Sequence, residues 1–211
     1  MTPDEIWHCI DHKLIGILRG ITPPETEDIV VALLDAGFRA IEIPLNSPDP
    51  FTSIEIAVDV AGRHTSDACL IGAGTALSVD DVENVHAAGG NLIVSPNIHP
   101  DVVRATRLHE MASFPGVFTA TEAHLAIRLG ATGLKFFPAS LIGPSGIKAV
   151  LATLPEQTQI CAVGGIGPDD FEKYLSAGVH GFGLGSNLYR PKSSAENVFK
   201  TAVLSMNAMR K

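Results

Sequence analysis

One lysine lies within an otherwise apolar segment of this 211-residue chain. Lys135 is flanked by apolar and aromatic residues in 133–138, a segment expected to form a buried strand. Burial disfavours the charged form of an amine and lowers its pKa, and a neutral amine is the nucleophile that attacks a ketone to form a Schiff base. Lys135 is therefore a candidate nucleophile. The alternatives are pairing with a buried carboxylate and a side chain that reaches the rim of the fold.

A carboxylate occupies a similar position in another apolar segment. Glu42 lies in the middle of residues 40–44, at a depth that matches that of Lys135. A structural ion pair between the two is one explanation, although desolvation can consume the Coulomb energy of a buried pair. The functional explanation is a partly desolvated carboxyl group with a raised pKa, which can exchange protons with the lysine and with substrate hydroxyls. Glu42 is thus a candidate general acid and base.

Two glycine-rich turns follow the last two apolar segments of the chain. The first contains Gly164 and Gly165, and the second contains Gly185 and Ser186. Glycines let main-chain N–H groups approach an anion closely, and we expect the helices after each turn to add donors at their N-termini. Tight-turn geometry could explain either pair alone. Two such pairs at matching positions favour a phosphate site.

Other polar residues also end apolar segments. Arg19 can hold a carboxylate through two hydrogen bonds, although a solvated arginine at the rim would show the same pattern. Thr75 and the pair 46–47, Asn-Ser, could donate hydrogen bonds, and ordinary turn chemistry explains that pair equally well. His8 and His12 have no third ligand nearby, so we expect no metal ion there.

The elements that must position these residues alternate along the chain. Eight apolar segments, spaced roughly 20–30 residues apart, alternate with amphipathic helical stretches, as in successive βα units. The apolar segments are continuous, which is typical of parallel strands covered on both faces. The expected strands are 14–18, 40–44, 70–74, 92–95, a weak one at 112–117, 133–137, 160–164 and 181–184. The expected helices are 24–36, 50–62, 79–88, 100–108, 121–129, 145–154, 168–177 and one from about Ser194.

Helix ends support this pattern. A glycine closes each of four helical stretches just before a strand, where it can adopt the left-handed conformation. The four glycines are Gly37, Gly89, Gly130 and Gly178.

The pattern predicts a compact (β/α)8 TIM barrel, in one domain over residues 1–211. A doubly wound open sheet ranks second, since the first strand lacks a G-x-G-x-x-G loop. A helix that contains Ile6, Trp7 and Ile10 would suit the bottom of the barrel, which it would cover.

Composition limits the classes of partner. With 15 Lys+Arg against 23 Asp+Glu the formal net charge is -8, which argues against nucleic acid and anionic membranes. The acidic start and the lack of an apolar run of roughly 20 residues favour a cytoplasmic protein without a membrane span. Cys9, Cys69 and Cys161 are widely separated, so neither a disulfide framework nor a cysteine zinc site is expected.

Barrels carry their active sites at the carboxyl ends of the strands and commonly bind phosphate after the seventh and eighth. The residues alone therefore predict a Schiff-base aldolase whose lysine attacks the carbonyl of an anionic, phosphorylated substrate. A sugar-phosphate isomerase and a metal-dependent aldolase are alternatives among enzymes. A non-catalytic sugar-phosphate-binding barrel is the alternative from another class, and it would need no buried lysine.

Seven segments together resemble the 2-keto-3-deoxy-6-phosphogluconate and 6-phosphogalactonate aldolases, lyases of sugar-acid and galactose catabolism. They are 17–22, 42–48, 71–75, 95–98, 134–138, 162–166 and 183–186. The resemblance runs from the first strand to the loop after the eighth and so spans nearly all the chain. The resemblance implies a homotrimer that uses no metal or organic cofactor. Its substrate would be a small phosphorylated 2-keto-3-deoxy sugar acid, split into pyruvate and glyceraldehyde 3-phosphate.

The resemblance also implies a role for each candidate residue. Lys135 would be the Schiff-base lysine and Glu42 the general acid and base. Arg19 and Thr75 would hold the pyruvate-derived end of the substrate, including its carboxylate. The phosphate would be held by Gly164, Gly165, Gly185 and Ser186.

Within this family the chain looks closer to the phosphogalactonate branch, partly because Val163 precedes the Gly-Gly pair. The phosphogluconate branch usually has threonine there. The two substrates differ in configuration at C4, so loss of the hydroxyl at position 163 would change which epimer is matched. Phe118 departs from the family, whose members usually carry a smaller residue, and the resemblance implies altered packing near the end of the fifth strand.

Overall fold

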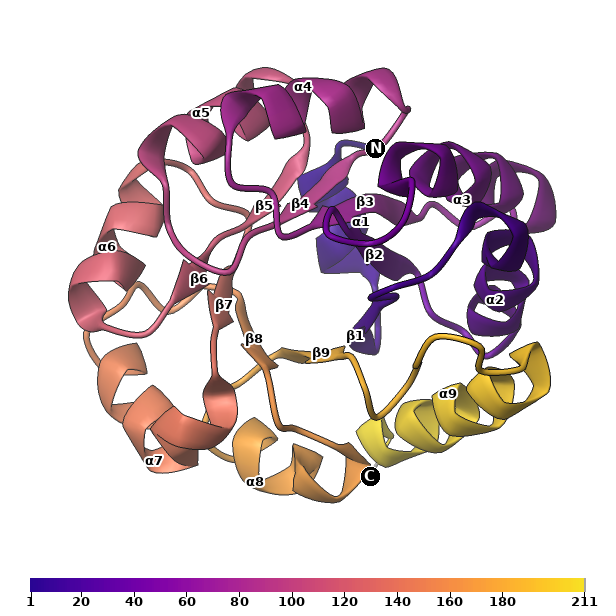
Figure 1. Cartoon of the computed structure of the whole chain (residues 1–211). Helices are drawn as coiled ribbons and strands as arrows, with labels where there is room; N and C mark the ends of the chain where they lie inside the picture. The colour runs from indigo at the N-terminus through magenta and orange to yellow at the C-terminus, as the bar shows by residue number, and fades with distance from the viewer. Residues whose placement is uncertain (211) are drawn as a thin grey trace.

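The computed structural model describes residues 1–210, which form a barrel of parallel strands surrounded by helices (Figure 1). The strand order β5-β4-β3-β2-β1-β9-β8-β7-β6 confirms the expected (β/α)8 TIM barrel and excludes the open-sheet alternative. The strands are β1 Lys13–Ile17, β2 Ala40–Pro44, β3 Leu70–Gly74, β4 Leu92–Val94, β5 Ala112–Phe114, β6 Gly116–Val117, β7 Leu134–Phe136, β8 Ile160–Val163 and β9 Gly181–Leu184. The helices are α1 Pro3–Cys9, α2 Pro23–Asp35, α3 Pro50–His64, α4 Val79–Ala87, α5 Pro100–Leu108, α6 Ala120–Arg128, α7 Ala139–Leu151, the 3-10 turn η1 Pro168–Asp170, α8 Phe171–Leu175 and α9 Ala195–Met209.

The strands are covered on both faces, as their continuous apolar sequences predict. Every residue of β2 and β3 is buried. The larger apolar cluster lies between the strands and the outer helices, and a smaller one, which includes Ile15, Leu70 and Phe114, fills the barrel. Burial of apolar area on both sides contributes about 25 cal/mol per Å². The strand positions are thereby fixed, and with them the depth of any polar side chain.

The weak fifth strand divides into β5 and β6 around Pro115. Proline has no N–H to donate to a strand ladder, so the ladder is interrupted there. β5 pairs with β4, whereas β6 pairs with β7. The carbonyl oxygen of Pro115 still accepts a hydrogen bond from the Lys135 N–H at 3.0 Å. The two short strands therefore occupy one place in the barrel and close it.

Helix ends fall near their predicted positions, except in α7. The helix begins at Ala139 rather than at Ser145, because residues 139–142 form a first turn that the sequence pattern did not indicate. Gly143, with φ 70° and ψ 164°, separates this turn from the rest of α7. Pro144 then starts the second part, where its missing N–H costs little. The predicted glycine ends are confirmed by φ angles of 81° to 102° at Gly37, Gly89, Gly130 and Gly178.

Helix α1 covers the amino end of the barrel, as its apolar residues predict. Trp7 is fully buried, and its ring lies edge-on to that of Phe114 with the centroids 4.7 Å apart. An ion pair between Asp4 and Arg107, 2.7 Å long, ties α1 to α5. Thr132 also donates a hydrogen bond to Asp4. The short helix is thus held by packing and by a polar network at the same end of the barrel.

Replacement of Trp7 by alanine is expected to lower the free energy of unfolding by about 3–5 kcal/mol, the usual cost of deleting a large buried aromatic ring. Trp7→Phe is the matched control and should cost less, since it keeps a ring against Phe114. Urea denaturation followed by circular dichroism measures both. Equal stability of Trp7→Ala and the unaltered protein would show that α1 does not stabilise the barrel.

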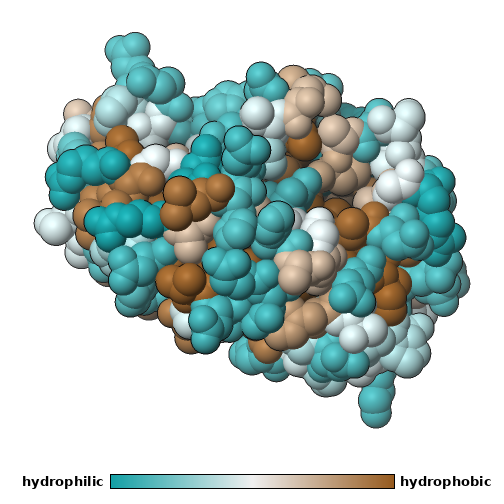
Figure 2. All heavy atoms as spheres, turned by 90° about the horizontal axis from the view of Figure 1, so that it is seen from above, coloured by the Kyte–Doolittle hydropathy of each residue, from teal (hydrophilic) through white to brown (hydrophobic). Residues whose placement is uncertain are grey.

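Within residues 1–210, no helix combines the length and the apolar character needed to cross a membrane. Figure 2 shows one face of the molecule, on which apolar side chains form several separate groups among polar ones. Large apolar side chains that remain exposed include Phe118 and Leu141. These two follow the neighbouring strands β6 and β7.

Candidate active site

A cavity of about 330 Å³ opens where the carboxyl ends of the strands meet. It is lined by every residue that the sequence singled out as catalytic or substrate-binding: Arg19, Glu42, Thr75, Lys135, Val163, Gly164, Gly165, Gly185 and Ser186. A larger cavity, about 570 Å³, lies at the other end beside α1 and contains none of these residues. The chemistry-bearing side chains therefore gather in the smaller cavity.

Lys135 is the buried cation of this cavity, with 6% of its surface exposed. Its position in β7, between Gly116 of β6 and Cys161 of β8, is set by the parallel register. Burial lowers the pKa of Lys135; the attraction of Glu42 opposes this shift, and the charge of Arg19 adds to it. The Nζ atom lies 4.9 Å from the centroid of the Phe137 ring. The environment thus favours a neutral amine that faces the cavity.

Glu42 is the buried carboxyl group opposite, and only 1% of its surface is exposed. Burial raises its pKa from 4.5 to about 7, against the attraction of Lys135 and Arg19. Its Oε2 atom has no hydrogen-bond partner in the described chain. Gly74 of β3 leaves room for the carboxyl group, because a Cβ there would overlap it. Such a group can release and accept a proton near neutral pH.

Lys135 and Glu42 do not form a structural ion pair. Among the residues that the structure describes, no contact of 4.0 Å or less joins their charged atoms. Each nevertheless influences the pKa of the other. The alternative of a purely structural salt bridge is therefore wrong. Both side chains instead line the same cavity, where a bound substrate could exchange protons with them.

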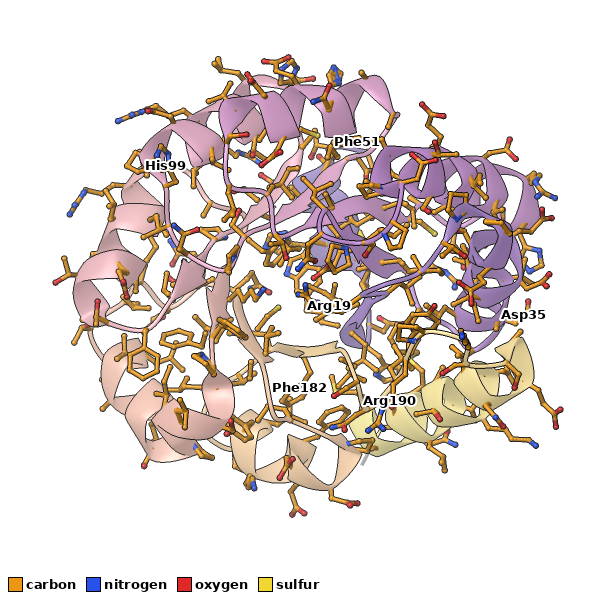
Figure 3. The ribbon with its side chains drawn as sticks, viewed as in Figure 1. Arg19, Asp35, Phe51, His99, Phe182 and Arg190 are labelled. Carbon is orange, nitrogen blue, oxygen red and sulfur yellow. The ribbon has the colours of Figure 1, made fainter. Side chains whose placement is uncertain are left out.

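Arg19 follows β1, lies near the middle of the barrel in Figure 3 and bonds to two neighbouring strand ends. Its Nη1 donates to Asn46 Oδ1 at 2.5 Å, and its Nη2 lies 3.5 Å from Thr75 Oγ1. Thr75 has φ 60°, a conformation rarely adopted by a β-branched residue. Strain of this kind clusters at binding sites, where the surrounding structure enforces it. Asn46 thus accepts a hydrogen bond through its side-chain oxygen, and it is not among the residues that line the cavity.

The two glycine turns present free main-chain donors to the cavity. Gly164 and Gly165 have φ angles of 94° and 74°, which turn the backbone after β8. In residues 1–210 no acceptor is found for their N–H groups or for those of Gly185 and Ser186. Unpaired N–H groups that converge on a cavity form a site for an anion.

The helices after these turns do not supply the additional donors that we expected. Pro168 begins the three-residue turn η1 rather than an α-helix, and the Gly167 N–H is already bonded to the carboxylate of Asp170 at 2.9 Å. The second turn leads into a loop, and α9 begins only at Ala195. A single helical turn over residues 185–189 takes the place of the expected helix directly after β9. In it, the N–H groups of residues 188 and 189 both bond to the Gly185 carbonyl oxygen.

Sequence reasoning did not assign a role to six other residues that line the cavity. Their types carry no charge, and only position marks them, because each lies near or just beyond the end of a strand. They are Ile17, Pro96, Phe137, Ile166, Gly183 and Asn187. Within residues 1–210, no cluster of three or more His, Cys, Asp or Glu side chains is arranged to hold a metal ion.

A parallel barrel with a desolvated lysine and a neutral-range carboxyl group at this end of its strands has the features of an enzyme active site, and a neutral lysine amine is a nucleophile toward carbonyl compounds. A sequence model described as KDPG and KHG aldolase matches residues 8–202. A protein of Rhizobium meliloti (strain 1021), named probable 2-dehydro-3-deoxy-6-phosphogalactonate aldolase, is 51% identical over 94% of this chain and 92% of its own length.

Solved structures agree with this similarity. The structure titled "Native KDPGal structure" is 47% identical, has a TM-score of 0.90 and is matched over 93% of this chain and 94% of that one. Another, a "cube-shaped, highly porous protein cage designed by fusing symmetric oligomeric domains", is 46% identical, with a TM-score of 0.91 over 95% of this chain and 73% of that one. The chain therefore belongs to the KDPG and KHG aldolase family, and it is a lyase of the aldolase type.

Proposed function

We propose that the protein is a class I aldolase that cleaves 2-dehydro-3-deoxy-6-phosphogalactonate reversibly to pyruvate and D-glyceraldehyde 3-phosphate. The observation that carries this proposal is the burial of Lys135, with a lowered pKa, in one cavity with Glu42 and four free N–H groups. The names of the similar proteins support the phosphogalactonate substrate. One domain, residues 1–211, would carry the whole function, in the cytoplasm.

The reaction begins with attack of the neutral Lys135 amine on the C2 ketone. Loss of water gives an iminium ion, which draws electrons from the C3–C4 bond. Glu42 takes the proton of the C4 hydroxyl, directly or through one water, while the C3–C4 bond breaks. The aldehyde product leaves with the phosphate. The enamine that remains is protonated at C3, and water then releases pyruvate from Lys135, so the sequence needs no metal or organic cofactor.

The polar groups at the rim would orient the substrate along the cavity. Arg19 can hold the carboxylate next to C2, with Thr75 as a second partner, because both lie at strand ends on the Glu42 side. The N–H groups of Gly164, Gly165, Gly185 and Ser186 would hold the phosphate at the other end of the substrate. Fixed placement at both ends positions C2 near Lys135 and the C4 hydroxyl near Glu42.

Val163 is proposed to select the configuration at C4. It ends β8, lines the cavity and is 5% exposed, and its methyl groups fill the space above Gly183. A valine cannot offer a hydrogen bond to a C4 hydroxyl. A site without that partner disfavours the epimer whose hydroxyl would point at position 163, because a buried hydroxyl without a partner loses about 1–3 kcal/mol.

A coupled assay of pyruvate release should therefore show faster cleavage of the phosphogalactonate than of its C4 epimer, the phosphogluconate. Val163→Thr is expected to lower this preference by about tenfold, as one added hydrogen bond implies. Val163→Ile, which changes size but adds no hydroxyl, is the control. Unchanged selectivity in Val163→Thr would contradict the role of Val163. Preference of the unaltered protein for the phosphogluconate would overturn the assigned substrate, and cleavage of neither would favour a non-catalytic sugar-phosphate-binding barrel.

A homotrimer is the proposed assembly. The designed cage whose title names symmetric oligomeric domains supports self-association of this fold, and the exposed side chains of Phe118 and Leu141 offer apolar area for it. Light scattering should give the mass of three chains. The double variant Phe118→Ser, Leu141→Ser should shift the protein toward the mass of one chain, and a monomeric unaltered protein would contradict the trimer.

A further inference from the structure

The two glycine turns that would hold the phosphate come from strands that separate at the cavity. β8 and β9 pair through Val163 and Gly183, and no main-chain bond joins them beyond this point in the described chain. One side-chain bond does so: Asn187 Nδ2 donates to the carbonyl oxygen of Ile166 at 2.9 Å. This bond links residues 21 positions apart, one from each turn.

Each turn is also held separately. The Gly164 carbonyl oxygen accepts a bond from the Ser140 N–H of α7 at 3.1 Å, which fixes the outer side of the first turn. In the second turn, Arg190 Nε donates to the Ser186 carbonyl oxygen at 3.2 Å. These bonds shape the turns individually. The bond from Asn187 to Ile166 is the one that joins the two turns to each other among the residues that the structure describes.

The distance between the two turns matters for binding because each turn supplies two of the four free N–H donors. The N–H groups of Gly164 and Gly165 come from one turn, and those of Gly185 and Ser186 come from the other. A phosphate held by both turns needs the spacing to be set before binding, since ordering glycine backbone afterwards costs free energy. Asn187 lines the same cavity, so its bond to Ile166 lies beside the expected phosphate position.

We infer that Asn187 is a positioning residue, whose carboxamide braces the two turns so that their N–H groups together bind the phosphate monoester of the substrate. The inference rests on the proposed function. Because the acceptor is a carbonyl oxygen, the side chain at position 187 must supply a donor, and the amide N–H of Asn187 does so. A leucine or an alanine at position 187 leaves the Ile166 oxygen without its partner and lets the turns separate.

The test compares phosphate binding and turnover in Asn187→Ala. Calorimetric titration with inorganic phosphate should show about three- to tenfold weaker binding, the effect of one lost hydrogen bond. KM for the phosphorylated substrate should rise by a similar factor with little change in kcat. Turnover of the unphosphorylated 2-keto-3-deoxygalactonate, and trapping of pyruvate on Lys135, should be unaffected, which a general loss of structure would not allow.

Asn197→Ala is the matched control, because this exposed asparagine follows the same loop and its side chain makes no hydrogen bond in the described chain. Asn187→Ser, which keeps a short donor, should recover part of the phosphate affinity and provides a second variant if Asn187→Ala is unstable. Equal losses with both substrates, or unchanged phosphate binding, would overturn the role of Asn187. If the unaltered protein cleaves neither sugar acid, the proposed function fails, while weaker phosphate binding in Asn187→Ala alone would still support the brace.

Discussion

Replacement of Lys135 by methionine is expected to lower kcat/KM by about 10⁴- to 10⁶-fold, the range found when a covalent nucleophile is removed. Methionine keeps much of the length of the side chain and suits the apolar surroundings of β7, so folding should be retained. Treatment of the unaltered protein with pyruvate and borohydride should leave a stable adduct on Lys135, identified by peptide mass mapping. The Lys135→Met protein should carry none.

Two controls separate nucleophilicity from charge and from burial. Lys135→Arg keeps the positive charge but has no neutral amine, and it should be as inactive as Lys135→Met. Lys13 is a second lysine inside the barrel, where its Nζ donates to the Ile10 carbonyl oxygen at 2.7 Å near the opposite end. Lys13→Met should still form the pyruvate adduct. An adduct on another lysine, or activity in Lys135→Met, would show that Lys135 is not the nucleophile.

The barrel and the positions of its two charged residues could be predicted from sequence because they depend on local composition. Repeating apolar segments fix the strands, and a charge such as Lys135 or Glu42 inside one stands out. The split at Pro115 and the early start of α7 escaped prediction, since both depend on which neighbouring strand or turn supplies the hydrogen bonds. Local sequence contains no such information.

The contacts between site residues were harder to predict than which residues form the site. The bond from Arg19 to Asn46 joins residues 27 positions apart, and the bond from Asn187 to Ile166 joins residues 21 apart. Both follow from the closure of the barrel, which brings strand ends together irrespective of their separation in sequence. Until the closure of the barrel is known, the sequence does not tell whether a polar residue just after a strand shapes a turn or belongs to the site. Turn chemistry and site chemistry use the same residue types.

The charge of the cavity also differs from that of the chain. The chain has a formal net charge of -8, but the cavity contains Arg19, Lys135 and a carboxyl group that is largely neutral below pH 7. An anionic substrate therefore meets local N–H donors and one or two cations rather than a negative field. Because the donors are main-chain groups, their strength does not vary with pH, and titration of the site is confined to the two buried side chains.

The titration of these two buried side chains, Glu42 and Lys135, predicts the effect of pH on catalysis. In the proposed mechanism Glu42 must be ionised to accept the C4 hydroxyl proton, and burial raises its pKa to about 7. In the unaltered protein the part of kcat/KM that depends on Glu42 should therefore rise with pH up to about 7 and then level off, and any further rise reports deprotonation of Lys135. Glu42→Gln is expected to reduce kcat/KM by about 10²- to 10⁴-fold above pH 7. The ratio between the two proteins should shrink at lower pH, where the natural carboxyl group is already protonated.

The same substitution has a second, independent readout in stability. Between pH 4.5 and about 7, the native protein holds a proton on Glu42 that the unfolded chain has lost, so unfolding releases it and rising pH favours the unfolded state. The free energy of unfolding should fall by up to about 3 kcal/mol across this range because of Glu42. In Glu42→Gln that part of the pH dependence should be absent, whereas Glu55→Gln, a change at an exposed carboxylate of α3, should preserve it.

Removal of Glu42 also affects Lys135, because the attraction of Glu42 opposes the lowering of the lysine pKa. The rate at which Glu42→Gln forms the pyruvate adduct should therefore depend on pH through Lys135 alone, with a midpoint below that of the natural protein. Adduct formation would persist in this variant while carbon–carbon cleavage is slow. Loss of both reactions together would contradict the assignment of Glu42 to the proton transfer at C4 and would place it in imine formation instead.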